Sequence, residues 1–514
     1  MQSFYLTTAI DYANGSPHLG HAYEKILADV IARHRRLTGR HVHFLTGIDE
    51  HGQKIVQTAE REKISPQELT ARTAPLFLEL CHKLEITNDD FIRTSEERHK
   101  EVVSSVLTKL HEQGDIYKDT YHGFYSVRQE QFVLEKEKVD GIWPEIYGEV
   151  IQIEEENYFF RLSKYQAWLT QYLRENTFVY PAYRQKQVLE FLREPVNDLC
   201  ISRPIERLAW GIPLPFDPSF VTYVWFDALI NYISAVGYGT PAFNEKWPAS
   251  YHIIGKDILV PAHAVYWPIM LKALDLPLPE HLLVHGWWHL AGQKMSKSTG
   301  LTVDPIQLAE TFGADALRYF FIREMNVGQD SDFTEQLFLS RYNSDLVNDL
   351  GNLLSRLLNM GHRYCSGIVP KPEVQEEPEQ SLSAVARETI AATREQFEGF
   401  LFHSGLEAIF NLIRATNRYA EIRAPWQLAK SDLPADQAAL RSTLAHLTEG
   451  LRIAAILLAP VTPQASAEVL ARIGLPPVRS WEDQRLDLTF EATGASFGEK
   501  TILFPRHSLE PSSK

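Results

Sequence analysis

The stretch NGSPHLGHAYEK, residues 14–25, places His18 and His21 three positions apart around Gly20. Zinc ligation would need further donors, and Glu24 is the only local candidate. Alternatively, either ring could lie in the core and bond a backbone carbonyl. A third interpretation is phosphate binding, in which Gly20 lets the ligand approach the backbone while the imidazoles donate hydrogen bonds. We favour phosphate, because a helix that follows the first strand of a parallel sheet offers an anion site at its N-terminus; the other interpretations stay open.

A second candidate segment, QKMSKSTG at residues 293–300, carries Lys294 and Lys297 among small residues. Taken alone, such a segment is more often a solvated charged loop. Nucleotidyl transfer, however, needs positive charge where the departing pyrophosphate accumulates negative charge. Two histidines and two lysines could supply it, so the two segments together indicate this chemistry more strongly than either alone.

The histidine pair must be positioned by the elements on either side of it. SFYLTTAI at residues 3–10 is typical of a buried strand, and residues 22–37 have apolar side chains at helical spacing. HVHFLTG at residues 41–47 returns as a strand. This order predicts a strand–helix–strand unit, and therefore a parallel sheet.

Farther along the chain, Ser65, Pro66 and Glu68 predict a capping box at the start of a helix. Residues 115–138 are aromatic and β-branched without helical period, which indicates a β-rich insertion, and residues 162–176 are helical again. Strand and helix signals then alternate from residue 222, so we expect the first sheet to resume. After about residue 335 amphipathic helices predict a bundle, with the acidic, Pro-rich segment 370–381 as a loop within it.

Composition limits the function classes. A chain of 514 residues is too long for one core, and its net charge of -15 argues against a general nucleic-acid coat protein. The three cysteines, Cys81, Cys200 and Cys365, are too far apart for a disulfide framework or a Cys-based zinc knuckle. No apolar run approaches the roughly 20 residues of a membrane-spanning helix, and no targeting signal is visible at Met1. We therefore expect a cytoplasmic protein.

The two candidate segments, HLGH and KMSKS, resemble the signatures of class I aminoacyl-tRNA synthetases. More narrowly, TGIDEHGQKI, WGIPLP, YVWFDALINY and APWQLAK are similar to segments of the methionyl-tRNA synthetase family, in the family's order. The resemblance implies an α/β fold, in which a Rossmann-like parallel-sheet catalytic domain is split by a small β-rich insertion and followed by an α-helical anticodon-binding bundle. It predicts five segments along the chain. The first half of the catalytic domain is at residues 1–114, the insertion at 115–202 and the second catalytic half at 203–285. The stem-contact region with the KMSKS loop is at 286–335, and the anticodon-binding bundle is at 336–514.

The resemblance also implies the reaction, in which L-methionine is activated with ATP and Mg²⁺ to methionyl adenylate and then transferred to tRNA(Met). His18, His21 and Lys297 would stabilise the transition state and the pyrophosphate, with Lys294 assisting and Gly20 at the phosphates. Asp257 would contact the ribose, and backbone around Trp287 the adenine. Either of these last two could instead be structural.

For the amino acid, the resemblance pairs the substrate ammonium with Asp49, a charge-assisted hydrogen bond. An apolar pocket for the thioether would comprise Ile10, Tyr12, Trp225, Ala228, Tyr232 and His263. Any single aromatic among them could be ordinary core. In the bundle, Trp426 would stack on an anticodon base, with Asn352 and Arg356 as polar contacts. A lone tryptophan beside a proline could also simply pack.

Departures from the family pattern lead to further expectations. Ser126 stands where relatives with a zinc knuckle have a cysteine, so we expect no structural zinc and no other metal ligands. Asp11, Ile48 and Leu301 also differ from the usual residues. The chain ends at Lys514 without a dimer-forming extension, so we expect a monomer. We expect no membrane partner, because the apolar runs are too short to span a bilayer. A small-molecule adenylyltransferase and a non-catalytic tRNA-binding relative are the rival functions.

Overall fold

The computed structural model describes residues 3–126, 131–133, 135, 138–139, 141–290, 293–294, 303–482 and 486–508, except the side chains of residues 122, 131, 132, 146, 293 and 294. The chain forms two compact units. The first unit comprises Met1–Ser16, His43–Glu79 and Asn88–Val284, and the second comprises Pro17–Val42, Leu80–Thr87 and His285–Lys514. The predicted domain boundaries stay predictions.

A seven-stranded sheet forms the centre of the first unit, with strand order β2-β3-β1-β13-β14-β8 and β4 beside β3. The pairings of β1 with β13, β2 with β3, β3 with β4 and β14 with β8 are all parallel. The predicted parallel sheet is therefore confirmed. The strands are β1 (Phe4–Thr8), β2 (Asp11–Tyr12), β3 (Val42–Asp49), β4 (Asp90–Arg93), β8 (Val179–Tyr180), β13 (Tyr251–Gly255) and β14 (His281–His285).

Helices α2 (Gln53–Glu62), α3 (Pro66–Lys83) and α4 (Glu97–Glu112) follow β3 and β4 along the chain. The predicted capping box at α3 is confirmed, because the Ser65 backbone N–H donates to Glu68 Oε2 at 2.8 Å and the Glu68 backbone N–H donates to Ser65 Oγ at 3.2 Å. Sequence over four residues was sufficient to locate this helix start.

The β-rich character predicted for the insertion is confirmed by a four-stranded sheet of order β6-β5-β7-β9. A three-stranded sheet of order β10-β12-β11 follows it and extends beyond residue 202, the predicted end of the insertion. Strand β8 comes from the same stretch of chain but pairs with β14 of the central sheet. The elements here are β5 (Ile116–Ser126), β6 (Gln131–Val133), η2 (Glu145–Tyr147), β7 (Val150–Phe160), η3 (Ser163–Tyr165), α5 (Gln166–Glu175), α6 (Ala182–Phe191), β9 (Leu199–Cys200), β10 (Ser202–Pro204), β11 (Pro213–Leu214) and β12 (Asp217–Thr222).

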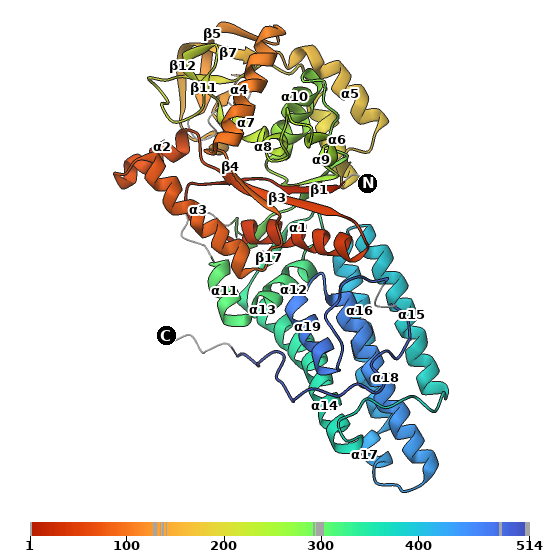
Figure 1. Ribbon diagram of the computed structural model, residues 1–514. Coiled ribbons are helices and arrows are strands. Elements are labelled where there is room, and N and C mark those ends of the chain that lie inside the picture. Colours follow the sequence, from red (N-terminus) through yellow and green to blue (C-terminus); the bar gives the residue numbers. More distant parts are fainter. Residues whose placement is uncertain are drawn as a thin grey trace. The chain divides into compact units, whose positions relative to one another are not determined.

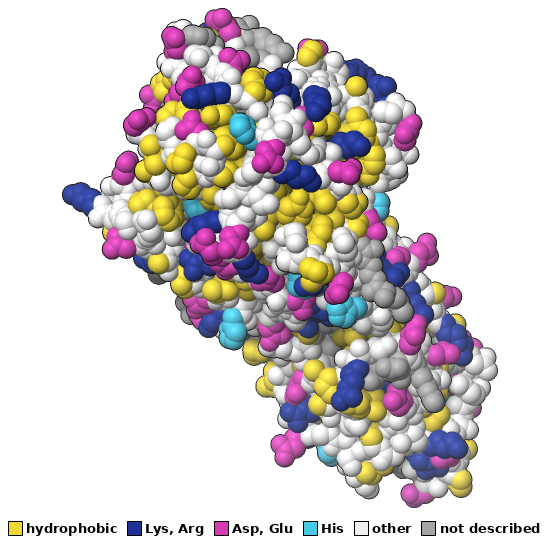
Figure 2. Space-filling view, turned by 45° about the horizontal axis from the view of Figure 1, so that its top comes forward, with side chains coloured by type: hydrophobic (Ala, Val, Ile, Leu, Met, Phe, Trp, Pro, Cys, Tyr) yellow, Lys and Arg dark blue, Asp and Glu magenta, His cyan; other side chains and the backbone are white. Residues whose placement is uncertain are grey.

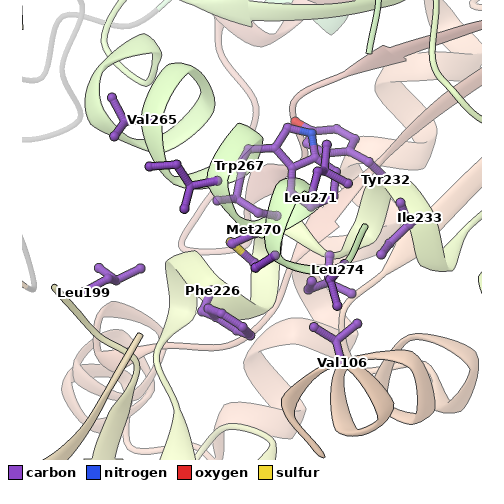
Figure 3. Packing of buried hydrophobic residues seen from close by; sticks show 14 of the residues in the cluster. Val106, Leu199, Phe226, Tyr232, Ile233, Val265, Trp267, Met270, Leu271 and Leu274 are labelled. Atoms are coloured by element: carbon purple, nitrogen blue, oxygen red, sulfur yellow. The ribbon is translucent and has the colours of Figure 1, made fainter. Parts of the chain in front are cut away.

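Short helices then complete the first unit: α7 (Val224–Leu229), α8 (Asn231–Ser234), α9 (Phe243–Lys246), η4 (Leu259–Tyr266) and α10 (Trp267–Ala273). Figure 1 shows α7, α8 and α10 on one side of the central sheet. The core beneath them is densely aromatic and aliphatic, and Figure 3 shows Trp267, Tyr232, Met270 and Leu271 packed together within it.

The second unit is mainly helical, as predicted for the chain after about residue 335. Its longest helices, α15, α16 and α18, lie side by side (Figure 1). A small sheet of order β16-β15-β17 precedes them. The elements are α1 (Leu19–Leu37), β15 (Trp288–Leu290), β16 (Gln293–Lys294), α11 (Pro305–Phe312), α12 (Ala314–Glu324), β17 (Ser331–Phe333), α13 (Glu335–Arg341), η6 (Tyr342–Gly351), α14 (Asn352–Tyr364), α15 (Glu377–Glu398), α16 (Phe402–Arg423), α17 (Pro425–Leu428), α18 (Pro434–Leu458) and α19 (Pro463–Arg472).

The predicted loop at residues 370–381 is wrong at its C-terminal end, because α15 already begins at Glu377. Glu376 and Glu379 form a capping box there, and the Glu376 backbone N–H donates to Glu379 Oε2 at 3.0 Å. Proline is tolerated in the first helical turn, since it lacks only an N–H that has no intrahelical acceptor. The acidic, proline-containing composition therefore marks a helix start as well as a loop.

Among the helices within the described ranges, none is long and apolar enough to cross a membrane. Figure 2 shows acidic and basic side chains interspersed on the face that it presents, with apolar patches between them. On this face, the acidic side chains are thus interspersed with basic ones rather than gathered in one acidic patch (Figure 2).

Candidate active site

Three predicted site residues lie at, or shortly after, the carboxyl ends of strands of the central sheet. β1 ends at Thr8, shortly before Ile10; β3 ends at Asp49; and β13 ends two residues before Asp257. Because these strands belong to one parallel sheet, their carboxyl ends share an edge, which is where open α/β sheets bind ligands. Asp49 is buried and pairs in register with Tyr12 of β2, whereas Asp257 is exposed.

Two of the predicted pocket residues are joined directly. The Tyr232 hydroxyl lies 2.8 Å from His263 Nε2, and His263 Nδ1 lies 2.9 Å from the Ile258 carbonyl oxygen. A carbonyl oxygen can only accept a hydrogen bond, so His263 carries its proton on Nδ1. When the ring is neutral, its Nε2 accepts the hydrogen bond that the Tyr232 hydroxyl donates. Both side chains are buried. On α7, Trp225 is half-buried and Ala228 is buried one turn later.

A buried carboxylate beside these residues was not found from the sequence. Asp227 Oδ2 lies 2.7 Å from His51 Nδ1, and Asp227 Oδ1 lies 2.7 Å from His99 Nε2. Burial raises the pKa of Asp227, but the two histidines outweigh that effect and lower it to about 2. The carboxylate thus ties α7 to α4 and to His51, which follows β3. The last residue of β3, Asp49, is linked to the same segment, because its Oδ1 accepts from the His51 backbone N–H at 3.3 Å. His51 and Asp227 lie in the short segments HG (residues 51–52) and FDA (residues 226–228), which carry no periodic signal. Their contact is therefore visible only in the folded structure.

In the second unit, His18 and His21 form a reciprocal cap at the start of α1. His18 Nδ1 accepts from the backbone N–H groups of Gly20 at 3.1 Å and His21 at 3.4 Å, while the His18 backbone N–H donates to His21 Nδ1 at 3.2 Å. The two rings stack with centroids 3.6 Å apart. Since both Nδ1 atoms accept, the proton of each neutral ring is on Nε2, where it can be donated to a ligand oxygen.

This geometry bears on the three interpretations of the histidine pair. A neutral imidazole that is protonated on Nε2 and accepts on Nδ1 has no lone pair left for a metal. A Cβ at Gly20 would lie 3.0 Å from His18 Cε1 and 3.1 Å from its Nδ1, so glycine gives the capping ring its space. Both rings are half-buried rather than core residues. The arrangement favours donation to an anion over zinc binding or core packing.

Glu24, the possible third zinc donor, has another partner in this unit. Its Oε2 lies 3.0 Å from His285 Nε2, and His285 Nδ1 lies 2.7 Å from the Gly286 carbonyl oxygen. Nearby, the Trp287 backbone N–H donates to Asp330 Oδ1 at 2.9 Å, which fixes the backbone predicted to contact adenine.

The two predicted lysines are described only in part. The backbone of Lys294 belongs to β16 and pairs with His289, whereas Lys297 and Leu301 lie outside the described residues. Over the described part of the chain, no group of three His, Cys, Asp or Glu side chains is arranged to hold a metal ion. Ser126 donates its hydroxyl to the Tyr147 carbonyl at 2.6 Å. The absence of structural zinc stays a prediction.

The structure brings two of the three predicted anticodon residues together in the second unit. The Arg356 guanidinium carbon lies 5.8 Å from the centroid of the half-buried Trp426 ring, and Arg356 donates to Glu421 Oε1 at 2.6 Å. Asn352 is exposed one helical turn before Arg356 on α14. Between α16 and α17, Ala424 has φ 43°, a left-handed conformation that turns the chain just before Trp426.

Comparison with known proteins agrees with this arrangement. The family model "tRNA synthetases class I (M)" matches residues 4–152 and 144–358, and the model "Anticodon binding domain of methionyl tRNA ligase" matches residues 369–510. The chain belongs to the methionyl-tRNA synthetase family. Its class is thus that of an ATP-dependent aminoacyl-tRNA synthetase, a ligase, as the resemblance implied.

Individual members of the methionyl-tRNA synthetase family are similar over nearly the whole chain. The methionine–tRNA ligase of Bacillus subtilis is 42% identical over 99% of this chain and 78% of its own length, and that of Rhizobium meliloti is 45% identical over 93% and 92%. The structure of Mycobacterium tuberculosis methionyl-tRNA synthetase in complex with methionyl-adenylate has a TM-score of 0.93 and 40% identity, covering 98% of this chain and 100% of that one. The Rossmann-like fold with a helical anticodon-binding domain is therefore confirmed.

Proposed function

We propose that the chain converts L-methionine and ATP to methionyl adenylate and pyrophosphate, and then transfers the methionyl group to the terminal adenosine of tRNA(Met). Family membership supports the reaction. The observation that carries the assignment of the residues is the reciprocal cap of His18 and His21, because acceptance at both Nδ1 atoms puts the proton of each neutral ring on Nε2.

In the first step, a methionine carboxylate oxygen forms a bond to the α-phosphorus while the bond from that phosphorus to the pyrophosphate oxygen breaks. Negative charge grows on the phosphate oxygens, and prearranged donors stabilise it. We assign this role to His18 and His21, with the backbone at Gly20 nearby. Lys297, with assistance from Lys294, would stabilise the leaving pyrophosphate. Asp257 would bind the ribose, and the backbone at Trp287 the adenine.

On the methionine side, Asp49 would accept a hydrogen bond from the substrate ammonium, and its burial strengthens such a contact. The side chain would be enclosed by the predicted pocket residues Ile10, Tyr12, Trp225, Ala228, Tyr232 and His263. Aromatic walls suit a polarisable sulfur. Apolar selection is limited, so we expect weak activation of norleucine and homocysteine.

Magnesium would be supplied with ATP. The described residues offer no ready cluster of three metal-binding side chains, and Mg²⁺ commonly stays on substrate phosphates with few protein ligands. Its function would be to neutralise phosphate charge. A monomeric state and a cytoplasmic location remain predictions from the sequence.

For tRNA(Met), we assign anticodon recognition to Trp426 by stacking and to Arg356 and Asn352 by hydrogen bonds. The proximity of the Arg356 guanidinium to the Trp426 ring supports a shared binding surface. Bases of single-stranded loops are read by this combination of stacking and edge contacts.

The test is exchange of labelled pyrophosphate into ATP, run separately with each amino acid. We expect exchange with methionine, and a His21→Ala variant should lose about a hundredfold or more in rate, as removal of a transition-state donor does elsewhere. The matched control is His82→Ala, an exposed histidine at the end of α3, which should exchange normally. Exchange with no amino acid would support the tRNA-binding alternative, and exchange driven by another class of acid would support a small-molecule adenylyltransferase.

A further inference from the structure

His252 lies in strand β13 of the central sheet and is absent from the residues that the sequence predicts for substrate binding. Its side chain is fully buried. In the parallel register it stands opposite Thr7 of β1. Its Nδ1 lies 2.7 Å from Thr7 Oγ1, and its Nε2 lies 3.2 Å from Trp267 Nε1. Both ring nitrogens therefore have partners from different elements.

These partners determine the state of the ring. An indole N–H can only donate, so His252 Nε2 accepts from Trp267 and the ring proton is on Nδ1, which donates to Thr7. Burial, with the proximity of His263, lowers the pKa of His252 well below its ordinary value, so the ring is neutral at physiological pH. Rotation of the ring would break two buried hydrogen bonds, which is costly.

The fixed ring of His252 stacks on Tyr232. Their centroids are 4.1 Å apart, with an interplanar angle of 26°. Trp267 lies beside Tyr232 as well, with centroids 5.6 Å apart (Figure 3). Tyr232 has two further anchors, since its hydroxyl bonds His263 and its backbone oxygen accepts from the Tyr5 hydroxyl at 2.8 Å. Among these contacts, the His252 ring is the one that stacks face to face on the Tyr232 ring, so it bears directly on the plane in which that ring lies.

We propose that His252 is a positioning residue for methionine, which acts by holding the Tyr232 ring at the wall of the amino-acid pocket. This inference rests on the proposed function, because Tyr232 contacts methionine only if that assignment is correct. His252 itself does not contact the substrate. Its substitution should therefore affect methionine binding through Tyr232 and leave ATP binding almost unchanged, since His18, His21 and Lys297 lie on other segments.

The test compares two variants by pyrophosphate exchange. His252→Ala removes the stack and should raise KM for methionine about tenfold, which is the upper range for an aromatic pair, with KM for ATP within about twofold. His252→Phe keeps a stacking ring but loses both hydrogen bonds, and should restore most of the methionine affinity. The matched control is His281→Ala in neighbouring β14, where the ring contacts Tyr251 at 5.2 Å and no predicted pocket residue.

Melting temperatures with and without methionine provide a second measurement if the alanine variant is unstable. The methionine-induced rise should shrink in His252→Ala and recover in His252→Phe. The inference is overturned if KM for methionine is unchanged, if KM for methionine and ATP rise together, or if phenylalanine fails to restore binding in a folded protein. Wild-type protein that shows no methionine-dependent exchange would instead overturn the proposed function, and the inference with it.

Discussion

A Gly20→Ala substitution separates the stability of α1 from the position of the His18 ring. The new Cβ would lie 3.0 Å from His18 Cε1 and 3.1 Å from His18 Nδ1, so the ring must move by a few tenths of an ångström. Alanine is favoured over glycine in a helix by about 1 kcal/mol. Weakening the cap that His18 makes with the Gly20 and His21 backbone costs a similar amount, about 1 kcal/mol. The two effects oppose each other, so the free energy of unfolding should stay within about 1 kcal/mol of wild type.

Activity should respond differently from stability. A displaced donor no longer matches the transition state, and small misplacements of catalytic groups are costly, so we expect kcat for pyrophosphate exchange to fall about tenfold or more. Urea unfolding measures the first quantity and exchange kinetics the second. The control is Gly399→Ala, where a Cβ would meet only backbone oxygens at 3.6 and 3.8 Å, an ordinary contact distance.

Two results would contradict this reasoning. An alanine variant that is more stable than wild type and retains its kcat would show that the position of the His18 ring does not matter for catalysis. An equal fall of kcat in Gly20→Ala and Gly399→Ala would show that the effect is not local to the ring.

Three other predictions concern buried carboxylates and the tRNA site. Asp227→Asn should lower the free energy of unfolding by about 3 kcal/mol at pH 7, because it breaks the buried contacts with His51 and His99. The pKa of Asp227, about 2, lies below that of an unfolded aspartate. Its contribution to the free energy of unfolding is therefore complete above about pH 4 and is lost as pH falls toward 2. Urea unfolding of both proteins over this pH range should show this loss of stability only in wild type. Burial raises the pKa of Asp315 to about 7, so between about pH 4 and 7 the folded state retains a proton that the unfolded chain releases. The free energy of unfolding of the wild type should therefore fall as pH rises from about 4 to 7. The Asp315→Asn variant should not show this fall. Trp426→Ala should raise KM for tRNA about tenfold in aminoacylation assays without changing pyrophosphate exchange, and unchanged discrimination between anticodon variants would remove the role of Trp426.

Local patterns were sufficient for many elements of the fold. The capping box at Ser65 and Glu68 required only four residues, and the strand–helix–strand order at the N-terminus followed from the spacing of apolar residues. The end of the loop before Glu377 was misjudged because the same acidic residues and proline suit both a loop and a first helical turn.

The reciprocal cap of His18 and His21 could in principle be found from the sequence, since its partners lie within three residues. It was missed because histidine is not among the usual N-cap residues. The motif resemblance indicated that the two rings act on phosphate, but the backbone geometry of α1 determines which nitrogen of each ring carries the proton.

The sequence by itself determined the family, the order of the elements and the residues whose types suit the reaction. Tertiary structure decided that Asp227 lies between His51 and His99, and that His252 is fixed between Thr7 and Trp267. Helix and strand signals depend on side chains a few positions apart, whereas burial, protonation and ring orientation depend on groups that only folding brings into contact.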